Sequence, residues 1–149
     1  MNYIIERTTT ENVNFKNLEK QLDNELYEIY GDMQNNYSSH NYVKDLKTII
    51  VYENQKPIGC GCIKYLKDDL AEVKRVFVSL ESRCKGVAKI LIKEIEKIAM
   101  EDNIKRLILQ TGSRQEPAIN LYKSMNYKLI DNYGPYINDN NSVCMEKII

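Results

Sequence analysis

Apolar residues recur along this chain with two different periods, and these periods predict where strands and helices lie. Runs of five to ten residues that are rich in Val, Ile and Tyr predict strands, because such residues suit a pleated, half-buried surface. The predicted strands cover residues 2–8, 47–53, 57–66, 70–79, 105–111, 127–131 and 142–147. Apolar residues at helical spacing predict amphipathic helices from about 14 to 30, 86 to 100 and 116 to 125.

The connections between these elements predict how the strands pair. Asn54-Gln55-Lys56 has the length and polarity of a hairpin turn, so its flanking strands should be antiparallel. A long helix separates strands 70–79 and 105–111, and a strand–helix–strand crossover requires a parallel pair. Residues 32–46 have no clear period and are interpreted as a loop or weak helix. The prediction is one mixed α/β domain over residues 1–149.

Composition and charge exclude several classes of protein. Hydrophobic residues make up 43% of the 149 positions and charged residues 28%, as in ordinary globular domains. Lys and Arg balance Asp and Glu at 21 each, which argues against a general nucleic-acid binder. No apolar run approaches the length of a membrane span, and the N-terminus lacks a signal-peptide pattern. We therefore expect a cytoplasmic protein without a membrane partner.

The four cysteines do not form a metal-binding pattern. Cys60 and Cys62 should share one face of a strand, where they are poorly placed to bridge each other. There is no C-x-x-C, and the single histidine, His40, is distant in sequence, so we expect no metal and reduced, packed cysteines. Cys84 is the exception, because it lies in a cationic turn where the pKa of a thiol can fall.

That turn, Arg83-Cys84-Lys85-Gly86-Val87-Ala88, joins a strand to the start of a long helix. The first N–H groups of a helix have no intrahelical partner and carry partial positive charge. Gly86 allows a phosphate to approach the backbone closely, and two cations stand beside it. The turn lacks both common phosphate-loop patterns, so an anion site and an ordinary strand–helix connection with basic residues both remain open.

Three motifs resemble those of the GCN5-related N-acetyltransferases, a family that uses acetyl-coenzyme A. The family pattern [QR]-x-x-G-x-[GA] matches Arg83-x-x-Gly86-x-Ala88, and EVKRVFVS before it resembles the family's fourth strand. AINLYKSMNY resembles the family's helix-to-strand signature, and the order of elements agrees along essentially the whole chain. Departures are Gln115 for a usual Asn, Asn126 for a usual Gly, and Cys84. The resemblance implies a mixed, mostly antiparallel sheet of about seven strands with helices on both faces.

The resemblance also implies how acetyl-coenzyme A is held. Its pantetheine arm should pair with the backbone of Val76, Phe77 and Val78, and Gln115 and Tyr122 should also contact it. The residues implied to hold its pyrophosphate are Arg83, Cys84, Lys85, Gly86, Val87 and Ala88.

The implied chemistry is attack of an amine on a thioester, which needs a base, an oxyanion donor and an acid. Tyr122 matches the family's acid, with a packed core tyrosine as the alternative. The N–H of Val78 is the implied oxyanion donor. Glu72 matches the base used by several relatives, and an ordered water is the alternative. Strand alternation puts Glu72, Lys74, Val76 and Val78 on one face, where the charged pair lines a cleft or faces solvent.

The acceptor is expected to be a small primary amine, such as an amino acid, a polyamine or an amine antibiotic. Aromatic residues with a few carboxylates suit a small cation. The residues that the resemblance places around the acceptor are Glu25, Tyr30, Tyr37, Tyr42, Tyr133 and Tyr136. Alternatives are a protein N-terminal or lysine acetyltransferase and a non-catalytic acyl-CoA sensor. Relatives are often dimers, so the resemblance allows a homodimer.

Overall fold

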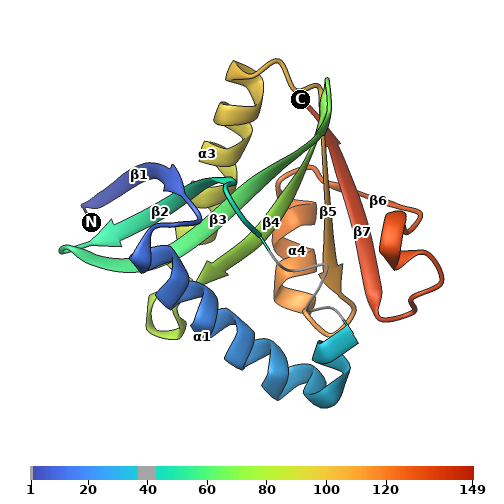
Figure 1. The fold of residues 1–149 in the computed structure, drawn as a ribbon, viewed down its shortest axis with the longest axis horizontal. Coiled ribbons are helices and arrows are strands. Elements are labelled where there is room, and N and C mark those ends of the chain that lie inside the picture. The colour runs from blue at the N-terminus through green and yellow to red at the C-terminus, as the bar shows by residue number, and fades with distance from the viewer. Residues whose placement is uncertain (1, 37–42) are drawn as a thin grey trace.

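A computed structural model describes residues 2–36 and 43–149 and places a single seven-stranded sheet at the centre of the fold. The strand order is β1-β2-β3-β4-β5-β7-β6, and β4 with β5 is the parallel pair (Figure 1). The strands are β1 (Tyr3–Thr9), β2 (Lys47–Glu53), β3 (Lys56–Lys67), β4 (Leu70–Val78), β5 (Arg106–Gly112), β6 (Lys128–Ile130) and β7 (Ser142–Ile148). The predicted mixed, mostly antiparallel sheet is confirmed.

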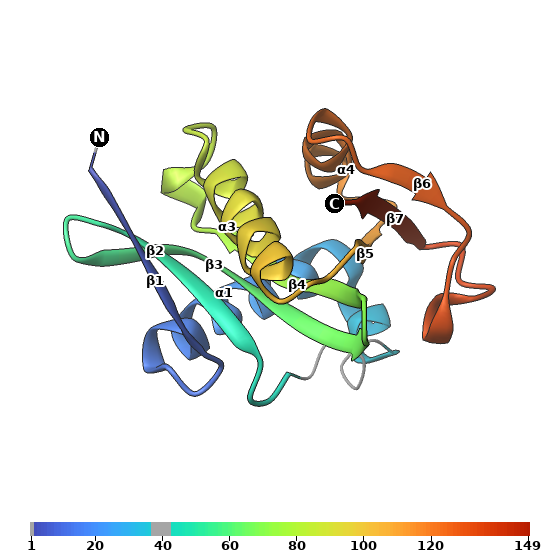
Figure 2. The same cartoon turned by 90° about the horizontal axis from the view of Figure 1, so that it is seen from above.

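Helices cover both faces of the sheet, so each face buries its own apolar cluster (Figures 1 and 2). α1 (Val13–Tyr30) lies against one face, and α3 (Val87–Glu101) and α4 (Glu116–Ser124) lie against the other. The buried stripe of α1 consists of Phe15, Leu18, Leu22, Leu26 and Tyr30. Helical spacing predicts the first four of these positions, with Ile29 as the fifth, whereas the structure buries Tyr30. Burying each large apolar side chain contributes about 1.5–3 kcal/mol.

β4 and β5 are neighbours for only part of their length. Their pairing runs from Leu70 with Arg106 to Val73 with Leu109. Beyond that point β4 continues beside β3, whereas β5 continues beside β7 as far as Gly112. Because each strand follows a different partner, the two separate in the middle of the sheet.

A β-bulge in β4 changes which side chains share a face. Arg75 has a φ of 57°, and together with Val76 it lies opposite the single residue Gly61 of β3. The extra residue reverses the alternation, so Val76 and Val78 join the face covered by α3. Glu72 lies before the bulge and points to the α1 face. The prediction that strict alternation keeps Glu72 with Val76 and Val78 is therefore wrong.

Residues with positive φ and one capping side chain define the turns and helix ends, and the hairpin turn is one residue shorter than the predicted Asn54-Gln55-Lys56 because β3 begins at Lys56. Asn54 and Gln55 both have positive φ, as a two-residue hairpin turn requires. The side chain of Asn12 accepts a hydrogen bond from the N–H of Asn14 and caps α1. Asn126 follows α4 with a φ of 72°, a left-handed conformation that asparagine tolerates better than most residues.

Residues 32–46 are only partly described. A short 3₁₀ helix, η1 (Gly31–Asn36), continues from α1. Tyr37 and Tyr42, which the sequence proposes for the acceptor site, lie outside the described residues. Among the helices that are described, none combines the length and the apolar character needed to cross a membrane.

Candidate functional site

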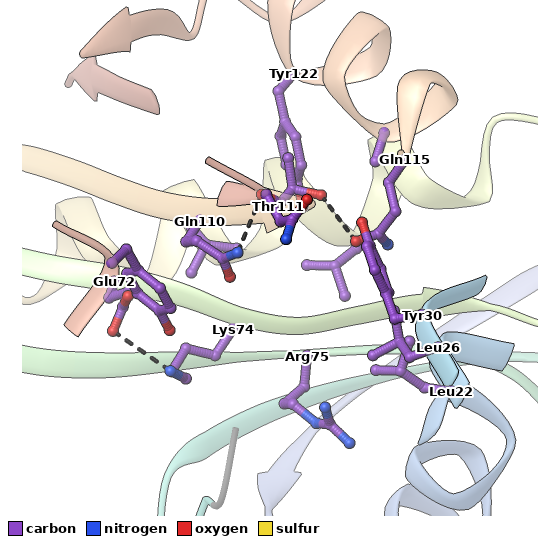
Figure 3. Close-up of a pocket in the computed structure, with 15 residues that line it drawn as sticks. Leu22, Leu26, Tyr30, Glu72, Lys74, Arg75, Gln110, Thr111, Gln115 and Tyr122 are labelled. Atoms are coloured by element: carbon purple, nitrogen blue, oxygen red, sulfur yellow. Dashed lines mark hydrogen bonds and ion pairs between the residues drawn. The ribbon is translucent and has the colours of Figure 1, made fainter. Parts of the chain in front are cut away.

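The separation of β4 and β5 leaves a partly open cavity of about 110 Å³ whose walls come from both helical layers (Figure 3). α1 contributes Leu22, Leu26 and Tyr30, and α4 contributes Ala118 and Tyr122. The other lining residues lie on the strands and the adjoining loops: Glu72, Val73, Lys74, Arg75, Val76, Gln110, Thr111, Gln115, Tyr136 and Asn141. Ligands that enter from opposite faces of the sheet can therefore meet here.

The edge of β4 that faces this cavity carries backbone groups that β5 does not pair. On its other edge, the N–H of Ser79 donates to the carbonyl of Ile58 over 2.8 Å. Successive N–H groups of a strand alternate in direction, so those of Val78 and Val76 point toward the cavity side. An extended amide ligand can pair with such an edge as an added strand.

The turn before α3 leaves the N-terminus of that helix open. Gly86 precedes the helix with a φ of 84°, and Cys84 has a φ of 61°. A Cβ on Gly86 would meet nothing within 4 Å, so the approach to the helix end is unobstructed. The first N–H groups of this 15-residue helix carry partial positive charge, and exposed Lys85 adds to it. The geometry of an anion site is thus present.

Arg83 points back toward the sheet. Its Nε donates to the carbonyl of Val78 over 2.9 Å, and its Nη2 donates to Glu25 over 2.5 Å. Its guanidinium lies over the Phe77 ring, 5.5 Å from the ring centroid. Arg83 therefore ties the end of β4 to α1. Glu25, which the sequence assigns to the acceptor, is engaged in this ion pair and is not among the described residues that line the cavity.

Glu72 and Lys74 form a buried pair in the cavity wall on the α1 side. Their side chains are 7% and 8% exposed, and Glu72 Oε1 lies 3.7 Å from Lys74 Nζ. Glu72 Oε2 accepts a hydrogen bond from the Tyr133 hydroxyl over 2.5 Å. Burial lowers the pKa of Lys74, with Glu72 opposing the shift, and burial raises the pKa of Tyr133. The pair lines the cleft and does not face bulk solvent.

The bulge turns the buried side chain of Arg75 toward α1, where it has two carboxylate partners. Its Nε donates to Glu19 over 3.1 Å, and its Nη2 donates to Asp23. Burial raises the pKa of Glu19, although Arg75 opposes the shift. The guanidinium therefore fastens α1 to the bulge of β4, and its charge is neutralised locally.

Tyr122 lies in the cavity wall on the α4 side. It is buried, with 7% of its surface exposed, and its ring meets that of Tyr127 edge to face with centroids 5.5 Å apart. Burial alone raises the pKa of Tyr122, which keeps the phenol protonated at neutral pH. The hydroxyl of neighbouring Tyr127 donates to Glu96 over 2.8 Å, and Lys147 pairs with the same carboxylate. This network fixes the ring against which Tyr122 packs.

Tyr30 closes the cavity at the end of α1. Its hydroxyl accepts a hydrogen bond from the N–H of Arg114 over 3.4 Å, and the Arg114 guanidinium lies over its ring. The hydroxyl fits against Gly112, where a Cβ would overlap it. Gln115 Oε1 accepts from the N–H of Gly112 over 3.0 Å and so orders the turn into α4.

The loop between β6 and β7 supplies the last wall of the cavity. Tyr136 lines the cavity and is 2% exposed, and Tyr133 meets its ring edge to face at 5.7 Å. The structure therefore brings Glu72, Tyr122 and the two loop tyrosines to one place. Among the residues that line the cavity, Gln110, Thr111 and Asn141 were not predicted, since no motif marks them.

The amino-acid sequence matches the acetyltransferase (GNAT) family over residues 11–127. The uncharacterized N-acetyltransferase YsnE of Bacillus subtilis is 36% identical over 98 residues, which are 64% of this chain and 65% of YsnE. The match thus spans slightly less than two thirds of YsnE. An IAA acetyltransferase of Azospirillum brasilense is 31% identical over 136 residues, which are 85% of this chain and 88% of that protein.

Solved structures show the same fold. A protein of Klebsiella pneumoniae assigned as an acyl-CoA N-acyltransferase has a TM-score of 0.82 at 26% identity, over 98% of this chain and 97% of that one. A GNAT family acetyltransferase of Elizabethkingia anophelis, solved with acetyl-CoA bound, has a TM-score of 0.72 at 16% identity, over 99% of each chain. The family match over residues 11–127 shows that this chain belongs to the acetyltransferase (GNAT) family, whose acyl donor is acetyl-CoA.

Proposed function

We propose that this protein transfers the acetyl group of acetyl-CoA directly to a primary amine of a small molecule, inside the cavity between β4 and β5. The observation that carries the proposal is the placement of two candidate groups in one cavity. Glu72 lies on its α1 side and Tyr122 on its α4 side, as Figure 3 shows. An amine that enters past α1 and a thioester that enters past α4 meet between these two groups.

The open turn before α3 supports the binding of coenzyme A at this end of the cavity. The open helix N-terminus at Gly86 suits the pyrophosphate, which the N–H groups from Cys84 to Ala88 would hold, with Lys85 adding charge. The side chain of Val87 is buried in the core, so this residue contributes its backbone alone. Arg83 would act by fixing the turn through Val78 and Glu25.

The pantetheine arm would follow the unpaired edge of β4. The N–H groups of Val76 and Val78 point to that edge, and Phe77 between them packs on the opposite face. Gln115 stands at the start of α4 beside the same cavity, where its amide would contact the cofactor. Two strand-like hydrogen bonds would set the position of the arm along β4.

Acetyl-CoA supplies the thioester, and the chain supplies three groups for the transfer. Glu72 accepts the proton of the acceptor ammonium, either directly or through a water molecule. The N–H of Val78 stabilises negative charge on the acetyl oxygen. Tyr122 donates its proton to the departing sulfur, and the raised pKa that follows from burial keeps that proton in place until it is needed.

A small acceptor is favoured over a protein by the buried aromatic side chains that line the cavity. Tyr30 and Tyr136 are both buried in its wall, and the cavity volume of about 110 Å³ suits a compact molecule. A protein N-terminal or lysine acetyltransferase needs an open groove for a peptide. A non-catalytic acyl-CoA sensor would need the turn at Gly86 but not both Glu72 and Tyr122.

A thiol-release assay separates these alternatives. Purified protein is incubated with acetyl-CoA and, in turn, small primary amines, peptides with free N-termini and lysine peptides, and the release of coenzyme A is followed. Release with small amines and not with peptides is the expected result. Faster release with peptides would identify a protein acetyltransferase. Tight acetyl-CoA binding without release for any acceptor would identify a sensor.

A further inference from the structure

The α1-side wall of the cavity presents an anion and a cation side by side. Glu72 and Lys74 are two positions apart on the same strand face, and both side chains are buried. Their facing atoms are 3.7 Å apart, which is an ion-pair distance longer than that of a hydrogen bond. Both side chains line the cavity, so a ligand that binds there can approach both charges.

The two cations of this wall are paired with carboxylates on different elements. Arg75 is neutralised by Glu19 and Asp23 of α1, so its charge is satisfied within the protein. Lys74 has Glu72 as its close carboxylate, and the second oxygen of Glu72 accepts from Tyr133. Burial disfavours the charged form of Lys74, and an incoming anion would compensate for that cost.

A neutral donor lies in the same cavity wall. The side-chain amide of Asn141 donates to the thioether sulfur of Met33 over 3.9 Å, and a thioether is a weak acceptor. By contrast, the Gln110 amide already donates to the Thr111 carbonyl and the Ser142 hydroxyl. An oxygen-bearing ligand would therefore gain a stronger hydrogen bond from Asn141 than the one it replaces.

We propose that the acceptor is an amine that carries a carboxylate close to its amino group, as amino acids do. This inference rests on the proposed function. The carboxylate is bound by Lys74 and Asn141, and the amine lies beside Glu72. Each charge of such an acceptor then faces an opposite charge of the buried pair. A polyamine would instead place a second cation near Lys74, which is unfavourable in a buried site.

The test compares acceptors that differ only in the anionic group: alanine, alaninamide and ethylamine, with spermidine as a polyamine. Values of kcat/KM are compared after correction for the fraction of neutral amine at the assay pH. A charge-assisted hydrogen bond predicts at least about a tenfold preference for alanine over ethylamine. Lys74→Met should abolish this preference, which is measured as the ratio of kcat/KM for alanine to kcat/KM for ethylamine, so that any general loss caused by the change beside Glu72 cancels.

Two further variants keep the result interpretable. Lys67→Met removes an exposed lysine at the end of β3 and should leave the preference unchanged. If Lys74→Met fails to bind acetyl-CoA, Asn141→Ala replaces it and should reduce the preference by a smaller factor. Equal turnover of alanine, ethylamine and spermidine by the native protein would overturn the inference and leave the proposed function standing. A preference that survives in Lys74→Met and Asn141→Ala would also overturn it. No thiol release with any primary amine would overturn the proposed function.

Discussion

Replacing Gly112 by alanine should push Tyr30 out of the cavity wall. An ideal Cβ at position 112 would overlap the Tyr30 hydroxyl and lie 2.6 Å from its Cζ and 2.9 Å from Gln115 Oε1. The φ of Gly112 is not positive, so the conflict is steric. Forcing extra volume into a packed site costs about 1–3 kcal/mol. Alanine recovers about 0.4–1 kcal/mol by restricting the unfolded chain, so a net loss of about 1–2 kcal/mol is expected.

The assay is a double-mutant cycle between Gly112→Ala and Tyr30→Leu, in which chemical denaturation measures the free energy of unfolding of each variant. Because leucine is too short to reach position 112, Gly112→Ala should be neutral or slightly stabilising in the Tyr30→Leu background. The coupling free energy should then be about 1–3 kcal/mol. In the single variant, displacement of Tyr30 should raise the KM of the acceptor more than that of acetyl-CoA.

Two outcomes would refute this reasoning. Gly112→Ala with native stability would mean that Tyr30 does not occupy the space beside Gly112. An equal loss of stability in both backgrounds would mean that the strain lies elsewhere, for example at the Gln115 contact with the N–H of Gly112.

Three further predictions concern the cofactor turn and the buried tyrosines. Gly86→Glu should weaken the calorimetric affinity for acetyl-CoA at least about a hundredfold, because its carboxylate repels the pyrophosphate. Gly86→Asn is the control and should bind far better, because asparagine tolerates positive φ. Native affinity in Gly86→Glu would contradict the pyrophosphate assignment. Cys84 is exposed and the other three cysteines are buried, so a thiol reagent should modify one group rapidly. Acetyl-CoA should slow that reaction, because its pyrophosphate would cover the turn that contains Cys84. An unchanged rate would place the cofactor elsewhere. Burial and Glu96 raise the pKa of Tyr127 above its ordinary value of 10.0, so above that pH the unfolded chain releases a proton that the folded chain retains. The contribution of Tyr127 to the free energy of unfolding therefore falls by about 1.4 kcal/mol for each pH unit above 10. In urea melts at alkaline pH, the stability of Tyr127→Phe should fall less steeply with pH than that of the native protein. Equal slopes would contradict the raised pKa of Tyr127.

Much of the fold could be predicted because local patterns and burial agree. The strand predicted at 70–79 is β4 at Leu70–Val78, and the helix predicted from about 86 to 100 is α3 at Val87–Glu101. In α3 the periodic apolar residues are the buried ones, and in β4 the run of apolar residues locates the strand although the bulge breaks its alternation. The cationic turn is also visible in sequence, because Gly86 and its basic neighbours are contiguous.

The bulge at Arg75 could not be predicted, because what stabilises it is distant in sequence. An arginine with positive φ is locally unfavourable, and here Glu19 and Asp23 of α1 hold its guanidinium. Without the bulge, Glu72 and Val78 would share a face. The structure instead separates them onto opposite faces and leaves Glu72 and Lys74 facing the α1 side, where we propose that the acceptor binds.

The wall formed by Gln110, Thr111 and Asn141 escaped prediction for a related reason. These residues become cavity lining only because β5 leaves β4 and follows β7. That divergence depends on tertiary pairing. Glu25 illustrates the reverse case, since its position on α1 was predicted to face the acceptor, and its carboxylate binds Arg83.

The turnover number of Tyr122→Phe is the most direct test of the proposal that acetyl transfer occurs in this cavity between Tyr122 and Glu72. The change removes one hydroxyl from a buried ring and keeps the edge-to-face contact with Tyr127. With a small amine acceptor, we expect kcat to fall at least about tenfold, the lower range for a lost general acid, while the calorimetric affinity for acetyl-CoA stays near that of the native protein. Native kcat in this variant would contradict the assignment of Tyr122 as the acid, and with it the placement of the chemistry between Tyr122 and Glu72.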